Sequence, residues 1–80
     1  MQEQEIYSRL TTLFRDNFDD ESIVLTPQTT AHDIDGWDSA AHISLIVAIE
    51  EEFHIKLKTA ELESLKDVGE MARLIAKKTA

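Results

Sequence analysis

The amino-acid sequence predicts an all-α protein: a small four-helix bundle of three main helices and one short helix, with a long first loop. Its 80 residues are enough for one hydrophobic core but not for two, so residues 1–80 are predicted to form a single domain. Two glycines and one proline supply too little turn chemistry for a many-stranded sandwich. Hydrophobic residues make up 42% of the chain and recur at three- and four-residue spacing, as they do in amphipathic helices.

The first helix is predicted over residues 3–18. Apolar side chains recur there between polar positions and would form one buried face: Ile6, Tyr7, Leu10, Leu13, Phe14 and Phe18. Three acidic residues follow at 19–21, and negative charge is unfavourable at the carboxyl end of a helix. We therefore expect the helix to end at Phe18.

The long loop is predicted between the first helix and Asp38. A stretch of this length is unusual without structure of its own, so we expect apolar side chains to pin it across the bundle. The candidate anchors are Ile23, Val24, Leu25 and Ile34. Thr26–Pro27 favours an extended step between them, because proline disfavours helical backbone in the residue before it.

The second helix is predicted from about Ser39 to Phe53, and it is apolar on two faces. One face would line the core and holds His42, Leu45, Ile46, Ile49 and Phe53. A different face holds Ala40, Ile43 and Val47, with Ser44, Glu50 and Glu51 around them. A chain this short has little material to bury one helix on all sides, so the second face is predicted to meet a partner.

A short helix or turn is predicted at Thr59–Ser64, followed by the last main helix. Asp67 has the pattern of an N-cap, with Glu70 three residues later. Apolar residues then recur at helical spacing: Val68, Met71, Ala72 and Ile75. Lys77 and Lys78 lie near the carboxyl end, where positive charge is favourable.

Composition and charge exclude several classes of protein. The chain has no cysteine, so it has no disulfide framework, and its longest apolar run, Leu45–Ile49, is too short to span a membrane. The N-terminus lacks a basic export segment, so we expect a cytoplasmic monomer. The net charge is −8, and residues 16–55 hold ten acidic residues and no lysine or arginine. This field repels nucleic acid and anionic membranes and attracts basic protein surfaces.

The segment Gly36–Trp37–Asp38–Ser39 brings a serine to the first turn of the second helix. Unpaired backbone N–H groups and the positive end of the helix dipole make such a position suitable for a phosphate ester on Ser39. The alternative from the residues alone is that Asp38 or Ser39 only caps the helix.

Asp38–Ser39, then Leu45, Ile49–Glu50, Phe53 and Ile55 follow the pattern D-S-x5-L-x3-[LI]-E-x2-F-x-I. This pattern resembles that of acyl carrier proteins, and the likeness in length, acidity and helix order extends over the whole chain. The resemblance implies that Ser39, after Asp38, carries 4′-phosphopantetheine from coenzyme A, with acyl groups held as thioesters on its terminal thiol. The protein would then be a carrier and not an enzyme.

The resemblance also implies the partners, which are a phosphopantetheinyl transferase and acyl-loading and acyl-processing enzymes with basic surfaces. The second helix would recognise them through the face that holds Ala40, Ile43, Ser44, Val47, Glu50 and Glu51. Ala40, Ser44, Trp37 and His42 depart from carriers of fatty-acid synthesis and look more like freestanding carriers of specialised pathways. The cargo is not readable from the residues.

Several alternatives remain open. Within the same chemistry, the protein could be a peptidyl or D-alanyl carrier, and outside it an unmodified helical adaptor. Asp38, Ser39 and His42 could suggest a hydrolytic triad, but no oxyanion hole or glycine-rich elbow accompanies them. A calcium loop starting at Asp33 fails, because Asp38 replaces its glycine and Ser44 replaces its last glutamate. No metal site is therefore predicted.

Overall fold

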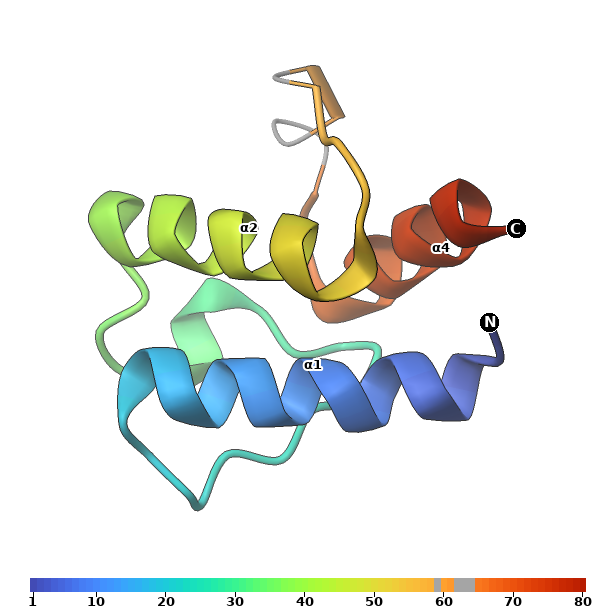
Figure 1. Ribbon diagram of the computed structural model, residues 1–80. Helices are drawn as coiled ribbons and strands as arrows, with labels where there is room; N and C mark the ends of the chain where they lie inside the picture. The colour runs from blue at the N-terminus through green and yellow to red at the C-terminus, as the bar shows by residue number, and fades with distance from the viewer. Residues whose placement is uncertain (59, 62–64) are drawn as a thin grey trace.

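The computed structural model describes residues 1–58, 60–61 and 65–80 and contains only helices and loops there (Figure 1). The helices are α1 (Glu3–Phe18), α2 (Ser39–Phe53) and α4 (Val68–Thr79), with a 3-10 helix η1 (Ala31–Asp33) in the long loop. The predicted fold class is confirmed, as are the bounds of α1 and α2 and the start of α4 after Asp67. Of the predicted short helix at Thr59–Ser64, residues 60 and 61 have helical backbone, and the rest lies outside the described residues.

The helices α2 and α4 both pack against α1, and α1 and α2 run in opposite directions (Figure 1). Each helix turns its apolar stripe inward. The buried apolar residues of α1 are Ile6, Leu10 and Phe14, those of α2 are Leu45, Ile46, Ile49 and Phe53, and those of α4 are Val68, Met71, Ala72 and Ile75. The predicted core face of α2 is confirmed, and His42 lies half-buried at its rim.

The carboxyl end of α1 is closed by backbone geometry. Asp19 adopts left-handed backbone with φ 50°, and the Asp20 amide donates to the Arg15 carbonyl at 3.0 Å. The Asp20 carboxylate accepts from the hydroxyl and the amide of Ser22, and these hydrogen bonds lower the pKa of Asp20. Arg15 donates to the Ile23 carbonyl at 3.0 Å. Local partners therefore compensate for acidic residues at an unfavourable helix end.

The loop anchors are mostly those predicted. Ile23 and Ile34 are buried, and Leu25 packs against the core. Val24 is not an anchor, because 72% of it is exposed. Neighbouring side chains in extended backbone point to opposite sides, so burying Ile23 and Leu25 turns Val24 toward solvent.

The loop also contains a 3-10 turn that was not predicted. Thr30 and Asp33 form a reciprocal capping box around η1. The sequence does contain a local signal for this capping box, because a threonine stands three residues before an acidic residue.

The loop is tied to the start of α4 by backbone hydrogen bonds. The Val68 amide donates to the Thr29 carbonyl at 2.9 Å, and the Gly69 amide donates to the Pro27 carbonyl at 3.0 Å. A Cβ atom on Gly69 would lie 2.8 Å from that carbonyl oxygen, so the close approach requires glycine. Asp67 caps α4 as predicted, accepting from the Glu70 amide at 2.8 Å.

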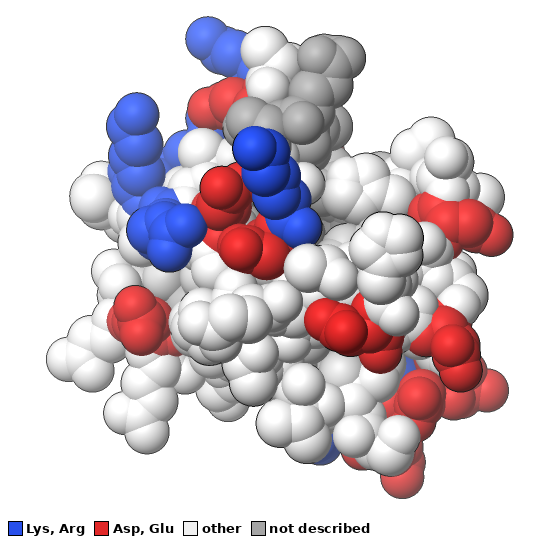
Figure 2. Space-filling model, turned by 180° about the vertical axis from the view of Figure 1, so that it is seen from behind, with Lys and Arg blue, Asp and Glu red and all other residues white. Residues whose placement is uncertain are grey.

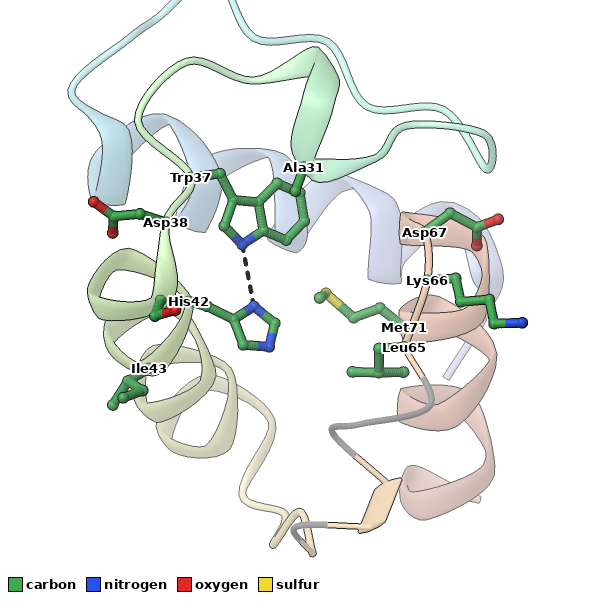
Figure 3. Close-up of a pocket in the computed structure, with 10 residues that line it drawn as sticks. Ala31, Trp37, Asp38, His42, Ile43, Leu65, Lys66, Asp67 and Met71 are labelled. Atoms are coloured by element: carbon green, nitrogen blue, oxygen red, sulfur yellow. Dashed lines mark hydrogen bonds between the residues drawn. The ribbon is translucent and has the colours of Figure 1, made fainter.

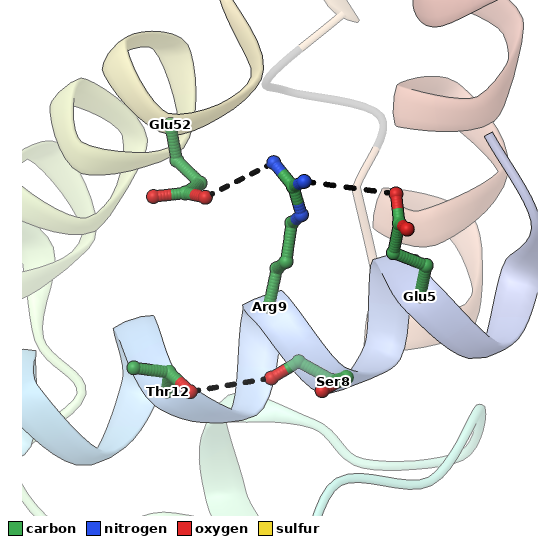
Figure 4. A network of polar contacts seen from close by, with 5 residues as sticks. All are labelled: Glu5, Ser8, Arg9, Thr12 and Glu52. Carbon is green, nitrogen blue, oxygen red and sulfur yellow. Dashed lines mark hydrogen bonds and ion pairs between the residues drawn. The ribbon is translucent and has the colours of Figure 1, made fainter.

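A polar cluster joins α1 and α2 at the surface (Figure 4). The Arg9 guanidinium lies 3.2 Å from Glu52 Oε2 and 3.7 Å from Glu5 Oε2, and 6.0 Å from the centre of the Phe53 ring. These ion pairs are exposed to solvent, so each adds at most about 1 kcal/mol of stability. They orient the two helices more than they stabilise them.

The segment that follows α2 is connected to α2 and to α4 by polar contacts. The Leu57 amide donates to the Glu50 carboxylate at 2.9 Å, and Lys78 Nζ lies 3.0 Å from Glu61 Oε1. The Lys58 amide and the Lys78 ammonium both lower the pKa of Glu61. Within the described part of the chain, none of the helices is long and apolar enough to cross a membrane.

Candidate functional site

The turn before α2 is anchored by an aromatic side chain. Gly36 has φ +85°, a left-handed conformation that glycine adopts without steric cost. The Trp37 ring then packs edge-on against Phe14, with 5.2 Å between ring centres. Phe18 lies 6.0 Å away on the same side of the core. The indole thus fixes where the chain leaves the loop and enters α2.

Asp38 is the N-cap of α2, and this role leaves Ser39 free. The Asp38 carboxylate accepts from the Ala41 amide at 2.8 Å, and the Asp38 carbonyl accepts from the His42 amide. Ser39 is the first helical residue and is exposed. Among the residues that the structure describes, the amides of Ser39 and Ala40 and the Ser39 hydroxyl have no hydrogen-bond partner. The serine oxygen is therefore accessible at the positive end of the helix dipole.

His42 is held by Trp37. The indole Nε1–H donates to His42 Nδ1 at 3.1 Å, and the two rings stack at 24° with centres 6.0 Å apart. His42 lies one turn after Ser39 on the same helix. The sequence placed His42 on the core face of α2, but no pattern in the sequence indicated this pairing.

An open cavity of about 770 Å³ lies beside Ser39 (Figure 3). It separates the first turns of α2 from the chain that leads into α4. Its lining residues are Ala31, Trp37, Asp38, Ser39, His42, Ile43, Leu65, Lys66, Asp67 and Met71. Leu65 and Met71 were not predicted as site residues. For Met71 the reason is that a methionine in the core and a methionine that also lines a cavity have the same helical spacing.

The outer face of α2 carries exposed apolar residues, as predicted. Ile43 is 66% exposed and Val47 is 48% exposed, and Ala40 and Ser44 are exposed beside them. The Ser44 hydroxyl donates to Asn17 Oδ1 at 3.0 Å, so it is held within the molecule.

Two contacts of this helix were not indicated by the sequence. Asn17 also donates to the Ala41 carbonyl at 3.2 Å, which ties the end of α1 to the start of α2. Glu50 is half-buried and binds the Leu57 amide at 2.9 Å, whereas Glu51 is exposed. Glu50 therefore supports the fold, and any role in binding a partner stays a prediction.

Charge is unevenly distributed over the surface. In Figure 2 most lysine and arginine side chains gather toward the upper left with some acidic side chains among them, whereas the lower right shows mainly acidic side chains. All six basic residues after position 55 belong to α4 or the chain that leads to it. The acidic stretch 16–55 contains the long loop and α2, so the field around Ser39 is negative.

The geometry does not form a catalytic dyad. His42 Nδ1 accepts from Trp37, and no hydrogen bond joins His42 to Ser39. Within residues 1–58, 60–61 and 65–80, no group of three histidine, aspartate or glutamate side chains is placed to hold a metal ion. What the site offers is an exposed hydroxyl on a capped helix start, next to an open cavity. This arrangement is compatible with a small helical carrier domain, in which a group attached at the helix start would lie beside the cavity.

Comparison with known proteins supports this class. A family model described as a phosphopantetheine attachment site matches residues 8–75. The acyl carrier protein of Picosynechococcus sp. is 32% identical over 77 residues, covering 95% of this chain and 94% of its own. That of Lactobacillus acidophilus is 32% identical over 76 residues, covering 94% of each chain. A solution NMR structure of a holo acyl carrier protein from Geobacter metallireducens has a TM-score of 0.86 and 51% identity, covering 90% of this chain and 83% of its own.

The chain belongs to the acyl carrier protein family. Its function is to carry acyl groups on a covalently attached phosphopantetheine group, and its partners are phosphopantetheinyl transferases and biosynthetic enzymes. The comparisons favour this function over an unmodified adaptor, because the matched family model is described by the attachment of the prosthetic group.

Proposed function

We propose that Ser39 is the attachment residue and that the protein presents an acyl thioester on an arm fixed there. The observation that carries this proposal is the position of Ser39: exposed, first in α2, and lining the cavity. Incubation with coenzyme A and a phosphopantetheinyl transferase, followed by intact mass measurement of the parent and of Ser39→Ala, tests it.

The residues around Ser39 fit a phosphate ester. The unpaired amides of Ser39 and Ala40 can donate to phosphate oxygens, and the helix dipole favours negative charge there. Asp38 supplies the cap from its own carboxylate, which points away from the cavity in Figure 3. Attachment at Ser39 therefore leaves the helix cap in place. When bound, the prosthetic group supplies the thiol that holds the acyl group, and the chain has no cysteine to compete with it.

We propose that partner enzymes with basic surfaces bind the outer face of α2. Ile43 and Val47 offer exposed apolar area close to Ser39, and Glu51 adds an exposed negative charge. Such a surface combines an apolar centre with charges at its rim, as protein interfaces do. The negative field of residues 16–55 opposes nucleic acid and anionic membranes. A cytoplasmic monomer remains our expectation for the free protein.

The acidic residues of α2 are expected to speed encounter with a partner more than they stabilise the fold. Replacing Glu50 and Glu51 by glutamine should leave the melting temperature unchanged or slightly higher, because it relieves charge repulsion at a negative helix end. Glutamine at position 50 also retains an oxygen that can accept from the Leu57 amide. Transfer of phosphopantetheine should slow by about two- to fivefold, in line with exposed pairs worth about 0.2–1 kcal/mol.

Salt provides a second readout of the same interaction. Above 0.1 M salt the field reaches only about 10 Å or less, so the parent reaction should slow and approach the rate of the double variant. Rates of modification and melting temperatures would be measured on the same samples. A double variant that melts earlier yet is modified at the parental rate would show that these two acids are structural.

We also expect that the isolated protein has no turnover of its own. His42 Nδ1 is engaged by Trp37, and no hydrogen bond joins His42 to Ser39, so among the described residues no general base contacts the serine oxygen. Hydrolysis of a p-nitrophenyl ester and of a free thioester should be no faster with the protein than with buffer. His42→Ala should not alter either rate, and hydrolysis that depends on His42 would contradict a purely carrying role.

A further inference from the structure

We propose that His42 donates a hydrogen bond from Nε2–H, in the cavity beside Ser39, to an oxygen acceptor on the attached group. This inference rests on the proposed attachment at Ser39. It goes beyond that attachment, because it assigns a chemical preference to the space in which the attached group would lie.

The pairing with Trp37 sets the tautomer of His42. An indole N–H can only donate, so the ring nitrogen that it contacts must be an unprotonated acceptor. That nitrogen is His42 Nδ1, at 3.1 Å from Trp37 Nε1. In the neutral imidazole the proton must then be on Nε2, and Nε2 is a donor with a fixed direction. Ring stacking at 24° holds the plane of the imidazole in addition.

The donor faces the cavity. Figure 3 shows Nε2 on the side of the ring away from Trp37, toward the space between His42 and Leu65. Both residues line the same open volume of about 770 Å³. No hydrogen bond or ion pair occupies Nε2 among the residues that the structure describes, so it is available to a ligand.

The other polar side chains of the lining are engaged elsewhere or point away. The indole N–H of Trp37 already donates to His42. The carboxylates of Asp38 and Asp67 cap α2 and α4, and a carboxylate only accepts. Lys66 extends away from the cavity in Figure 3. Beside Ser39 itself, His42 therefore provides the directed side-chain donor in a wall that is otherwise formed by apolar groups such as Ile43, Leu65 and Met71.

An acceptor oxygen would reach this donor from a group fixed at Ser39. Residues three apart on a helix have Cβ atoms about 5–6 Å apart, so a group fixed at Ser39 and lying in the cavity is within reach of His42. The acceptor is a carbonyl or hydroxyl oxygen. It could belong to the amides of the pantetheine arm or to an oxygen substituent of the acyl chain, and a plain hydrocarbon chain offers none.

The test uses imidazole ¹⁵N–¹H spectra of four forms of the full chain. These are the unmodified protein and the products made by a phosphopantetheinyl transferase from coenzyme A, butyryl-coenzyme A and 3-hydroxybutyryl-coenzyme A. We expect the unmodified protein to show a protonated Nε2 and an unprotonated Nδ1 at His42. Loading should then shift the Nε2–H signal of His42. The chain has three histidines, and His54 at the far end of α2 serves as the internal control that should not shift.

The three loaded forms distinguish the two sources of the oxygen. A shift already present in the coenzyme A product places the acceptor on the arm. A shift found only in the 3-hydroxybutyryl product places it on the acyl chain. In that case the hydroxyacyl thioester should also react with hydroxylamine more slowly than the butyryl thioester, by about two- to tenfold, as one neutral hydrogen bond would cause.

Two variants provide the matched controls. His42→Phe keeps an aromatic ring and removes the donor, and it should abolish the difference between the two thioesters. His42→Gln keeps an N–H group and should retain part of it. Far-ultraviolet circular dichroism and the melting temperature report whether each variant is folded.

The inference is overturned if the His42 signal is the same in all four forms. Where the acceptor lies on the acyl chain, the inference is also overturned if His42→Phe leaves the difference between the two thioesters unchanged. Intact mass is measured first, so a protein that never gains the arm at Ser39 is recognised as a failure of the proposed function, and the inference falls with it.

Discussion

Ser39→Ala should keep its unmodified mass under conditions in which the parent protein is fully converted by a phosphopantetheinyl transferase and coenzyme A. The loss of modification should be complete, because alanine has no side-chain hydroxyl to form the phosphate ester. The helix should be unaffected, since Asp38 and not Ser39 supplies the cap to the Ala41 amide. Alanine is also the best helix former at an exposed position.

Ser8→Ala is the matched control for this experiment. Ser8 is likewise exposed on a helix, but it lies on α1, away from the cavity. This variant should be converted like the parent. Equal melting temperatures of the parent and both variants would show that folding is not the cause of any difference. A Ser39→Ala protein that gains the mass of the arm would refute the assignment of Ser39.

Phe53→Ala should lower the free energy of unfolding by about 3–5 kcal/mol, as truncation of a buried aromatic side chain does. Phe53 is 5% exposed and faces the core from the last turn of α2. A domain of this kind has only about 5–15 kcal/mol of stability in total, so the loss is a large part of it. Phe53→Leu keeps most of the apolar volume and should lose clearly less, which keeps the test useful if the alanine variant does not fold.

Val47→Ala is the comparison on the same helix. Val47 is 48% exposed, and substitutions at such positions change stability by about 0.5 kcal/mol or less. Urea unfolding followed by circular dichroism would measure all of these variants. Equal losses at Phe53 and Val47 would show that the outer face of α2 is buried in solution, and the partner surface proposed for it would then be unavailable.

The fold was largely predictable because its signals are local. The apolar spacing of α1, α2 and α4 predicted their buried faces, and it predicted the bounds of α1 and α2. Asp67 could be recognised as a cap from its distance to Glu70. The motif around Ser39 likewise depends only on spacing within one helix. These features follow from neighbours in the chain, so they can be read without knowing what packs against them.

The prediction for Val24 was wrong because burial of a loop residue depends on which side of the chain meets the core. Ile23 and Val24 are both β-branched and adjacent, yet Ile23 is 7% exposed and Val24 is 72% exposed. The tie between Gly69 and the Pro27 carbonyl joins residues 42 positions apart and was equally invisible in the sequence. Side-chain polarity alone does not decide which of two neighbours turns inward.

The sequence by itself determined the three main helices, the capped start of α2 and the serine exposed there, because each depends on residues within a few positions of one another. Only the tertiary structure decided the surroundings of that serine. The loop brings Trp37 against Phe14 and within hydrogen-bond distance of His42, and the start of α4 brings Met71 to the other side of the cavity. Helical periodicity marks a side chain as inward or outward, whereas the direction of a donor such as His42 Nε2–H is set by the partner that packing places beside it.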